Sequence, residues 1–86
     1  MKKTLMIFTA SWCEQCTAQL EALATVKDIA DMPIAVMDVD KYPHLEEEYG
    51  VLKLPTFIAV QGAQLEVVKV VTGVHSLSEL EQKFGE

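Results

Sequence analysis

The feature that most limits the fold of this chain is a nearly continuous apolar run close to its start, Thr4 to Thr9. Because the run lacks the alternation of a half-exposed strand, it predicts a central β-strand that is covered on both faces. From about residue 13 to residue 30 there is no proline or glycine, and Leu20, Leu23 and Val26 recur at helical spacing. The first third of the chain therefore predicts a buried strand followed by one helix.

The rest of the chain continues to alternate between strands and helices. The elements expected there are a strand at 34–39, a short helix at 45–49, a hairpin of strands at 56–61 and 65–72, and a closing helix after residue 76. Pro43 suits a first helical position and Gly50 a helix cap, while Ser76 and Glu79 have the spacing of a capping box. The order β-α-β-α-β-β-α predicts an α/β fold with a mixed four-stranded sheet flanked by helices.

The length and net charge of the chain limit its number of domains and its kinds of partner. A chain of 86 residues has room for one core, so we expect residues 1–86 to form a single domain. The net charge is −6 and arginine is absent, which argues against a nucleic-acid partner. The apolar run at 5–8 is shorter than the core of a signal peptide, and no run approaches the ~18 residues of a membrane span. We expect a soluble, cytoplasmic monomer without a membrane partner.

Two cysteines stand where the first strand gives way to the first helix. Cys13 would face the unpaired N–H groups and the positive end of the helix dipole, which favour its thiolate, the form that attacks disulfides. Cys16 follows three residues later on the same helix face. A small tightening of the first turn would bring the pair within disulfide distance. The spacing therefore predicts Cys13 as the nucleophile and Cys16 as the resolving thiol.

The surroundings of the cysteines resemble the thioredoxin family. The resemblance rests on the sequence Ser-Trp-Cys-Glu-Gln-Cys at 11–16 after an apolar strand, and on Leu-Pro-Thr at 54–56 before a hairpin, and it covers nearly the whole chain. It implies the thioredoxin fold and a cis peptide bond before Pro55. It also implies that this loop lies beside the cysteines and presents the backbone of Leu54 to an extended substrate, with Gly73 lining the same groove.

Three neighbours of the cysteines have less certain roles. Trp12 either is only a hydrophobic packing residue or shields Cys13 beside the substrate, since an aromatic side chain suits both. Pro55 has an alternative interpretation as an ordinary proline at the start of a strand. Glu14 carries a carboxylate next to Cys13 that would oppose a second negative charge there, so we expect it to tune the redox properties of the pair.

The chain also departs from the family pattern. The buried acid of thioredoxins would fall at Ile7 and its partner lysine at Val36, so both are missing, and the first strand begins so early that only a glutaredoxin-sized core remains. Compared with a glutaredoxin, the segment 72–75 lacks the glycine-rich acidic turn that holds glutathione. These differences favour protein disulfides over glutathione as substrates.

The predicted activity is dithiol–disulfide exchange on protein disulfides through a mixed disulfide on Cys13. It needs no cofactor beyond the redox-active disulfide, but it needs a recycling reductase, which the sequence does not identify. One alternative is a redox-inactive or metal-binding module, in which Cys13, Cys16, His44 and His75 together would supply the four ligands of a zinc site. The other alternative is a glutathione-dependent enzyme of the glutaredoxin type.

Overall fold

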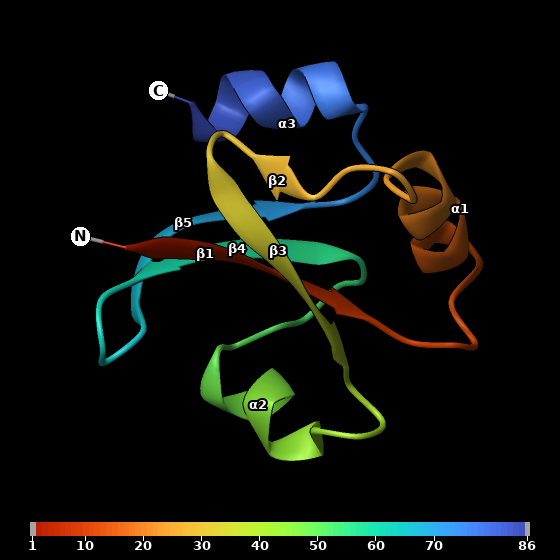
Figure 1. The fold of residues 1–86 in the computed structure, drawn as a ribbon. Coiled ribbons are helices and arrows are strands. Elements are labelled where there is room, and N and C mark those ends of the chain that lie inside the picture. The colour runs from red at the N-terminus through yellow and green to blue at the C-terminus, as the bar shows by residue number, and fades with distance from the viewer. Residues whose placement is uncertain (1, 86) are drawn as a thin grey trace.

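The computed structural model describes residues 2–85 as a sheet flanked by helices (Figure 1). The elements are β1 (Lys3–Thr9), α1 (Glu14–Ala22), β2 (Asp28–Ile29), β3 (Met32–Asp38), α2 (Pro43–Glu48), β4 (Thr56–Gln61), β5 (Glu66–Thr72) and α3 (Leu77–Phe84). The strand order is β2-β3-β1-β4-β5, with β1 parallel to β3 and the other neighbours antiparallel. Helices α2 and α3 lie on opposite faces of this mixed sheet, so the predicted α/β fold is confirmed.

The sheet has five strands, and the prediction of four strands was wrong. Helix α1 stops at Ala22 instead of continuing to residue 30, and Asp28–Ile29 pairs with the start of β3. The two residues between these strands, Ala30 and Asp31, have φ values of 50° and 63°. Such a two-residue turn is normally marked by Asn-Gly, which is absent here. Val26 packs on the same core as α1 although it lies outside the helix. The spacing of the apolar residues therefore predicted a longer helix than the one that forms.

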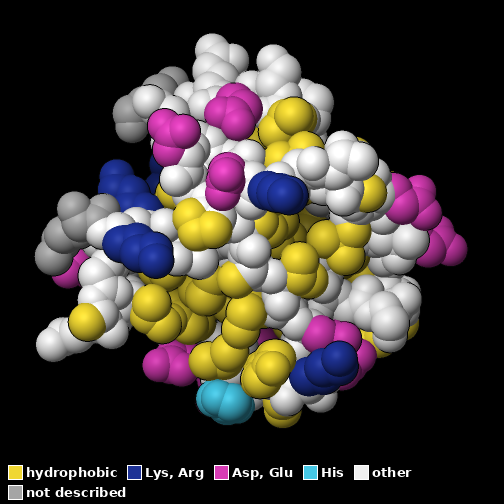
Figure 2. All heavy atoms as spheres, in the orientation of Figure 1, with side chains coloured by type: hydrophobic (Ala, Val, Ile, Leu, Met, Phe, Trp, Pro, Cys, Tyr) yellow, Lys and Arg dark blue, Asp and Glu magenta, His cyan; other side chains and the backbone are white. Residues whose placement is uncertain are grey.

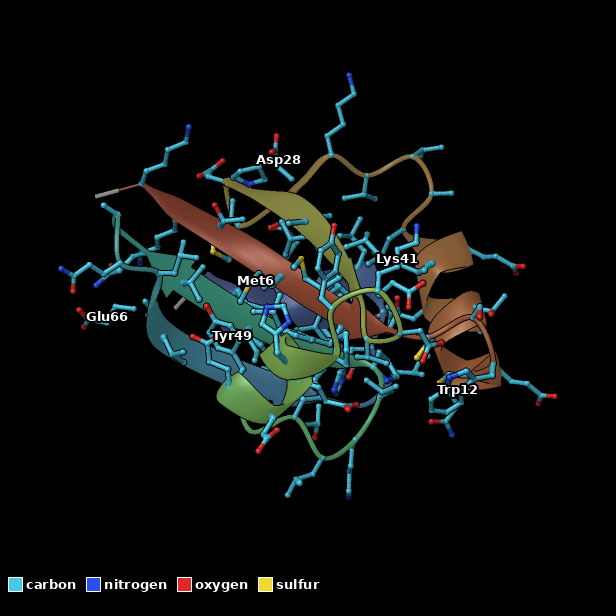
Figure 3. The ribbon with its side chains drawn as sticks, turned by 90° about the horizontal axis from the view of Figure 1, so that it is seen from below. Met6, Trp12, Asp28, Lys41, Tyr49 and Glu66 are labelled. Carbon is cyan, nitrogen blue, oxygen red and sulfur yellow. The ribbon has the colours of Figure 1, made fainter. Side chains whose placement is uncertain are left out.

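The apolar run of β1 is buried on both faces, as predicted. Leu5 and Ile7 belong to the core cluster on the side of α1 and α3, and Met6 and Phe8 belong to the cluster on the side of α2. Met6 and Tyr49 are labelled on the α2 face in Figure 3, and the Tyr49 ring lies 5.8 Å from that of Phe8. Each such side chain contributes about 1.5–3 kcal/mol on burial. Strand β1 therefore organises both halves of the core.

The face that carries α2 is less completely covered. Helix α2 has only six residues, and Val70 of β5 remains half exposed close to Tyr49. Hydrophobic side chains gather at the surface around this short helix in the lower half of Figure 2. Among residues 2–85, no helix has the length and apolar character needed to cross a membrane.

One end of the sheet brings together three distant segments. Phe8 near the end of β1 pairs with Thr56 at the start of β4, and Thr56 pairs with Thr72 at the end of β5. Because both pairings are antiparallel, the segment after β1, the loop before β4 and the segment after β5 leave the sheet at the same end. The candidate residues of the sequence lie in these three segments.

Candidate redox site

Cys13 is the N-cap of α1. Its φ and ψ are −95° and 108°, and its Sγ accepts a hydrogen bond of 3.2 Å from the backbone N–H of Cys16. The side chain is half-buried, so a partner can reach the sulfur. A sulfur in this position takes one of the unpaired N–H groups of the helix start and lies at the positive end of its dipole.

Cys16 lies one turn further into α1 and is fully buried. Both cysteines are free thiols, and the Cys16 thiol donates to the Cys13 sulfur across 2.6 Å. Burial, with a smaller contribution from the hydrogen bond to Cys13, raises the pKa of Cys16 to about 11. The two sulfurs thus differ in the way that nucleophile and resolving thiol require, since one is accessible and the other is buried and protonated at neutral pH.

The loop before β4 and the segment after β5 meet beside the cysteines. The Leu54–Pro55 peptide bond is cis, and the backbone N–H of Gly73 donates to the carbonyl oxygen of Pro55 at 2.9 Å. Gly73 has a φ of +89°, which favours glycine at this position. Leu54 and Cys13 pack against the same buried cluster. The structure therefore joins Gly73 directly to Pro55 and packs Leu54 and Cys13 against one cluster, while the roles of these residues in binding stay predictions.

Trp12 is 67% exposed, which excludes a role as a core packing residue. Its indole Nε1 donates to the carboxylate of Asp40, at 3.1 Å from Oδ2, and the backbone N–H of Asp40 donates to Asp38 Oδ1. In Figure 3 the ring lies beside the start of α1 at the edge of the molecule. The sequence analysis missed Asp40, although an acidic residue directly after a parallel strand was a visible signal. This carboxylate is thus hydrogen-bonded to the aromatic side chain that precedes Cys13.

Gln19 is a second residue that the sequence analysis missed. Its side chain is fully buried and joins α1 to the segment before α3 by two hydrogen bonds. Gln19 Nε2 donates to the carbonyl oxygen of His75 at 3.0 Å, and the backbone N–H of His75 donates to Gln19 Oε1 at 2.8 Å. The available signal was an amide three residues after Cys16, on the face of the helix that carries its apolar residues.

The remaining positions that the sequence singled out are Glu14, Ile7 and Val36. Glu14 is exposed at the first position of α1, and its effect on redox tuning stays a prediction. Ile7 and Val36 pair in register between β1 and β3, with Ile7 fully buried and Val36 half exposed, so an apolar side chain stands at each of the two positions.

The histidines do not join the cysteines. His44 is exposed on α2, while the His75 ring lies 2.8 Å from the carbonyl oxygen of Thr72 and 3.6 Å from the Glu79 carboxylate. Within residues 2–85, no three side chains of His, Cys, Asp or Glu come together in a way that could hold a metal ion. The four-ligand zinc site considered from the sequence is therefore not assembled in this part of the chain.

Comparison with known proteins agrees with the fold and with the cysteine spacing. The family model described as Thioredoxin matches residues 1–86. The chain belongs to the thioredoxin family. This membership confirms the resemblance stated from the sequence, and with it the expected family fold of a mixed sheet between helices.

Individual thioredoxins are similar at about one third identity. The chain is 35% identical over 68 residues to the chloroplastic thioredoxin Y2 of Arabidopsis thaliana, covering 74% of this chain and 40% of that protein. It is 32% identical over 73 residues to a thioredoxin of Streptomyces clavuligerus, covering 84% and 66%. The crystal structure of thioredoxin NaTrxh from Nicotiana alata superimposes with a TM-score of 0.80 at 30% identity, covering 96% of this chain and 70% of that one. The matched segments span two thirds or less of the two curated relatives.

Proposed function

We propose that this protein is a thiol–disulfide oxidoreductase that reduces disulfide bonds of other proteins. The observation that carries the proposal is the unequal pair in α1, a half-exposed Cys13 at the helix start with a buried Cys16 thiol 2.6 Å away. Little movement separates these sulfurs from a disulfide, whose S–S bond is about 2.05 Å long. Membership of the thioredoxin family supports the same activity.

The reaction uses the two sulfurs in sequence. The Cys13 thiolate attacks one sulfur of the client disulfide, forms a mixed disulfide and releases the other client sulfur as a thiolate, which takes up a proton. Cys16 then loses its proton, and its sulfur attacks Cys13 Sγ. This step forms the Cys13–Cys16 disulfide and releases the second client sulfur. The client gains two electrons and two protons, and the cysteine pair loses them.

The surroundings favour a polypeptide over glutathione. Exposed apolar side chains stand beside each part of the site, since Trp12 precedes Cys13, Val74 follows Gly73, and Leu52 lies at the start of the loop that contains Pro55. Apolar surface of this kind suits the side chains of an unfolded or extended protein. The charged groups of glutathione would gain little from it. A protein client with a disulfide in an extended segment fits this surface better.

The proposed activity also requires a reductase as partner and a reducing compartment. Each turnover leaves the Cys13–Cys16 pair oxidised, so a reductase of thiol or flavin chemistry must return two electrons. A reducing compartment such as the cytoplasm would keep the pair ready to act. We propose that the protein works there as a monomer.

The test is reduction of insulin disulfides by the purified protein with dithiothreitol as the electron donor. We expect wild type to accelerate the reaction and Cys13→Ser to abolish the acceleration. In a separate reaction without dithiothreitol, reduced Cys16→Ser should accumulate a mixed disulfide with insulin that mass spectrometry detects. A glutathione-coupled assay without dithiothreitol tests the glutaredoxin alternative. Metal analysis after purification, with thiol titration before and after a chelator, tests the metal-binding alternative. Equal trapping of clients by both serine variants would contradict the assigned roles.

A further inference from the structure

Gln19 is an unusual residue in the core of this protein. It is one of three buried polar residues among residues 2–85, and it lies 56 positions from its partner His75. The side-chain amide donates to the carbonyl oxygen of His75 and accepts from its N–H, so both backbone groups of one residue are bound by one side chain. A buried amide that is bound through both its nitrogen and its oxygen favours one geometry, because a displacement leaves buried polar groups without partners.

The segment bound by Gln19 makes further contacts of its own. The His75 ring contacts the carbonyl oxygen of Thr72, and its edge faces the Phe57 ring at a centroid distance of 6.5 Å. The next residue, Ser76, caps α3 through a reciprocal bond with Glu79. These contacts link residues 72–76 to β4 and to the start of α3.

The segment 72–76 is also bound to the loop before β4. The backbone N–H of Gly73 donates to the carbonyl oxygen of Pro55, so the 72–76 segment is bound at one end to α1 and at the other to the loop before β4. Gln19 lies on α1 one turn after Cys16, and both side chains are fully buried. A continuous chain of bonds thus runs from the cysteine helix through His75 and Gly73 to Pro55.

We propose that Gln19 is a positioning residue, which sets the distance between the cysteine helix and the loops of Gly73 and Pro55 that receive the client. This inference rests on the proposed function, because it concerns the binding of an extended client. The hydrogen bonds of Gln19 go to His75 and not to the reacting sulfurs. It acts on the reaction through the placement of His75 and Gly73.

The alternative is that Gln19 only contributes to stability. The two roles separate because a small disulfide reagent needs only the accessible Cys13 sulfur, whereas a peptide client also needs the loops of Gly73 and Pro55. Loss of the positioning role slows the reaction with the peptide and leaves the rate with the small reagent unchanged. Loss of stability alone changes neither rate while the protein stays folded.

The decisive substitution is Gln19→Met, which keeps the length of the side chain and removes its polar atoms. The substrates are a disulfide-bonded peptide with a fluorophore and a quencher, and Ellman's reagent. Ile29→Val is the matched control, since Ile29 is buried in the core cluster on the same face of the sheet. Denaturant melts establish that every variant is folded under the assay conditions.

We expect Gln19→Met to lower kcat/KM for the peptide about tenfold, mainly through KM, since small displacements of groups that bind substrate cost that much or more. The rate with Ellman's reagent should stay within about twofold of wild type. Exchange of the Gly73 amide proton, followed by NMR, should become faster because its bond to Pro55 loosens. Ile29→Val should change none of these quantities beyond about twofold.

Gln19→Glu provides a second test that does not depend on the methionine variant. Its ionised carboxylate can accept from the His75 N–H but cannot donate to the His75 oxygen, and protonation restores the donor. The ratio of variant to wild-type peptide activity should therefore rise as the pH falls. A ratio that is constant with pH would contradict the inference.

Two outcomes separate this inference from the proposed function. If wild type fails to reduce the peptide, the proposed function is wrong, while Gly73 amide exchange in Gln19→Met still tests the positioning. If wild type reduces the peptide but folded Gln19→Met does so equally well, the positioning role is wrong and the function stands. An equal loss of rate with the peptide and with Ellman's reagent would also overturn the positioning role, because Gln19 would then act on Cys13 itself.

Discussion

The step in which Cys16 resolves the mixed disulfide should depend steeply on pH. Burial is the largest cause that raises the pKa of Cys16 from 9.0 to about 11, and the Cys13 thiol adds to it. In the mixed disulfide Cys13 has no thiol, so its contribution is lost, while burial still raises the pKa of Cys16 above its ordinary value. Because a raised thiol pKa means fewer thiolates at neutral pH, only about 10⁻⁴ to 10⁻² of Cys16 is reactive at pH 7. The resolution rate should rise about tenfold per pH unit up to about pH 9.

Ellman's reagent separates the two steps in a stopped-flow experiment. Attack by Cys13 releases one equivalent of coloured thiolate, and resolution by Cys16 releases a second. We expect the slower phase to follow the predicted pH dependence, and Cys16→Ser to show the first phase alone. A second phase whose rate is already constant between about pH 7 and 9 would refute the reasoning, because Cys16 would then ionise as readily as an exposed thiol.

Three further substitutions, two of them paired with a control variant, test the surroundings of the site and the fold. Asp40→Ala should free the Trp12 indole, change its fluorescence and raise KM for a peptide disulfide a few-fold, whereas Asp40→Asn keeps an acceptor and should change these less. Ser76→Ala removes the cap of α3 and should lower the free energy of unfolding in urea by about 0.5–2 kcal/mol. Ala30→Gly relieves a φ of 50° and should raise that free energy by up to about 1 kcal/mol, while Ala18→Gly inside α1 should lower it by about as much.

The sequence predicted those elements that depend on interactions between residues close together in the chain. The strand at 56–61 and the capping box of α3 appear where the sequence places them, since β-branched runs and caps act over a few residues. Strand β2 was missed because its turn at Ala30 and Asp31 lacks the usual residues. Gln19 and Asp40 were missed for another reason, because their partners lie 56 and 28 positions away and only the folded sheet brings them together.

The candidate site is thus determined by two different levels of structure. The reactivity of the pair is local, because the start of α1 supplies the N–H group at Cys13 and the next turn buries Cys16. The surface proposed to receive a client is not local, because Asp40 after β3 binds Trp12 and Gln19 of α1 binds the segment that contains Gly73. A change that loosens the sheet end can therefore leave the thiol chemistry intact and still reduce the recognition of a protein disulfide. Measurements with small and large disulfides on the same variants report on these two levels separately.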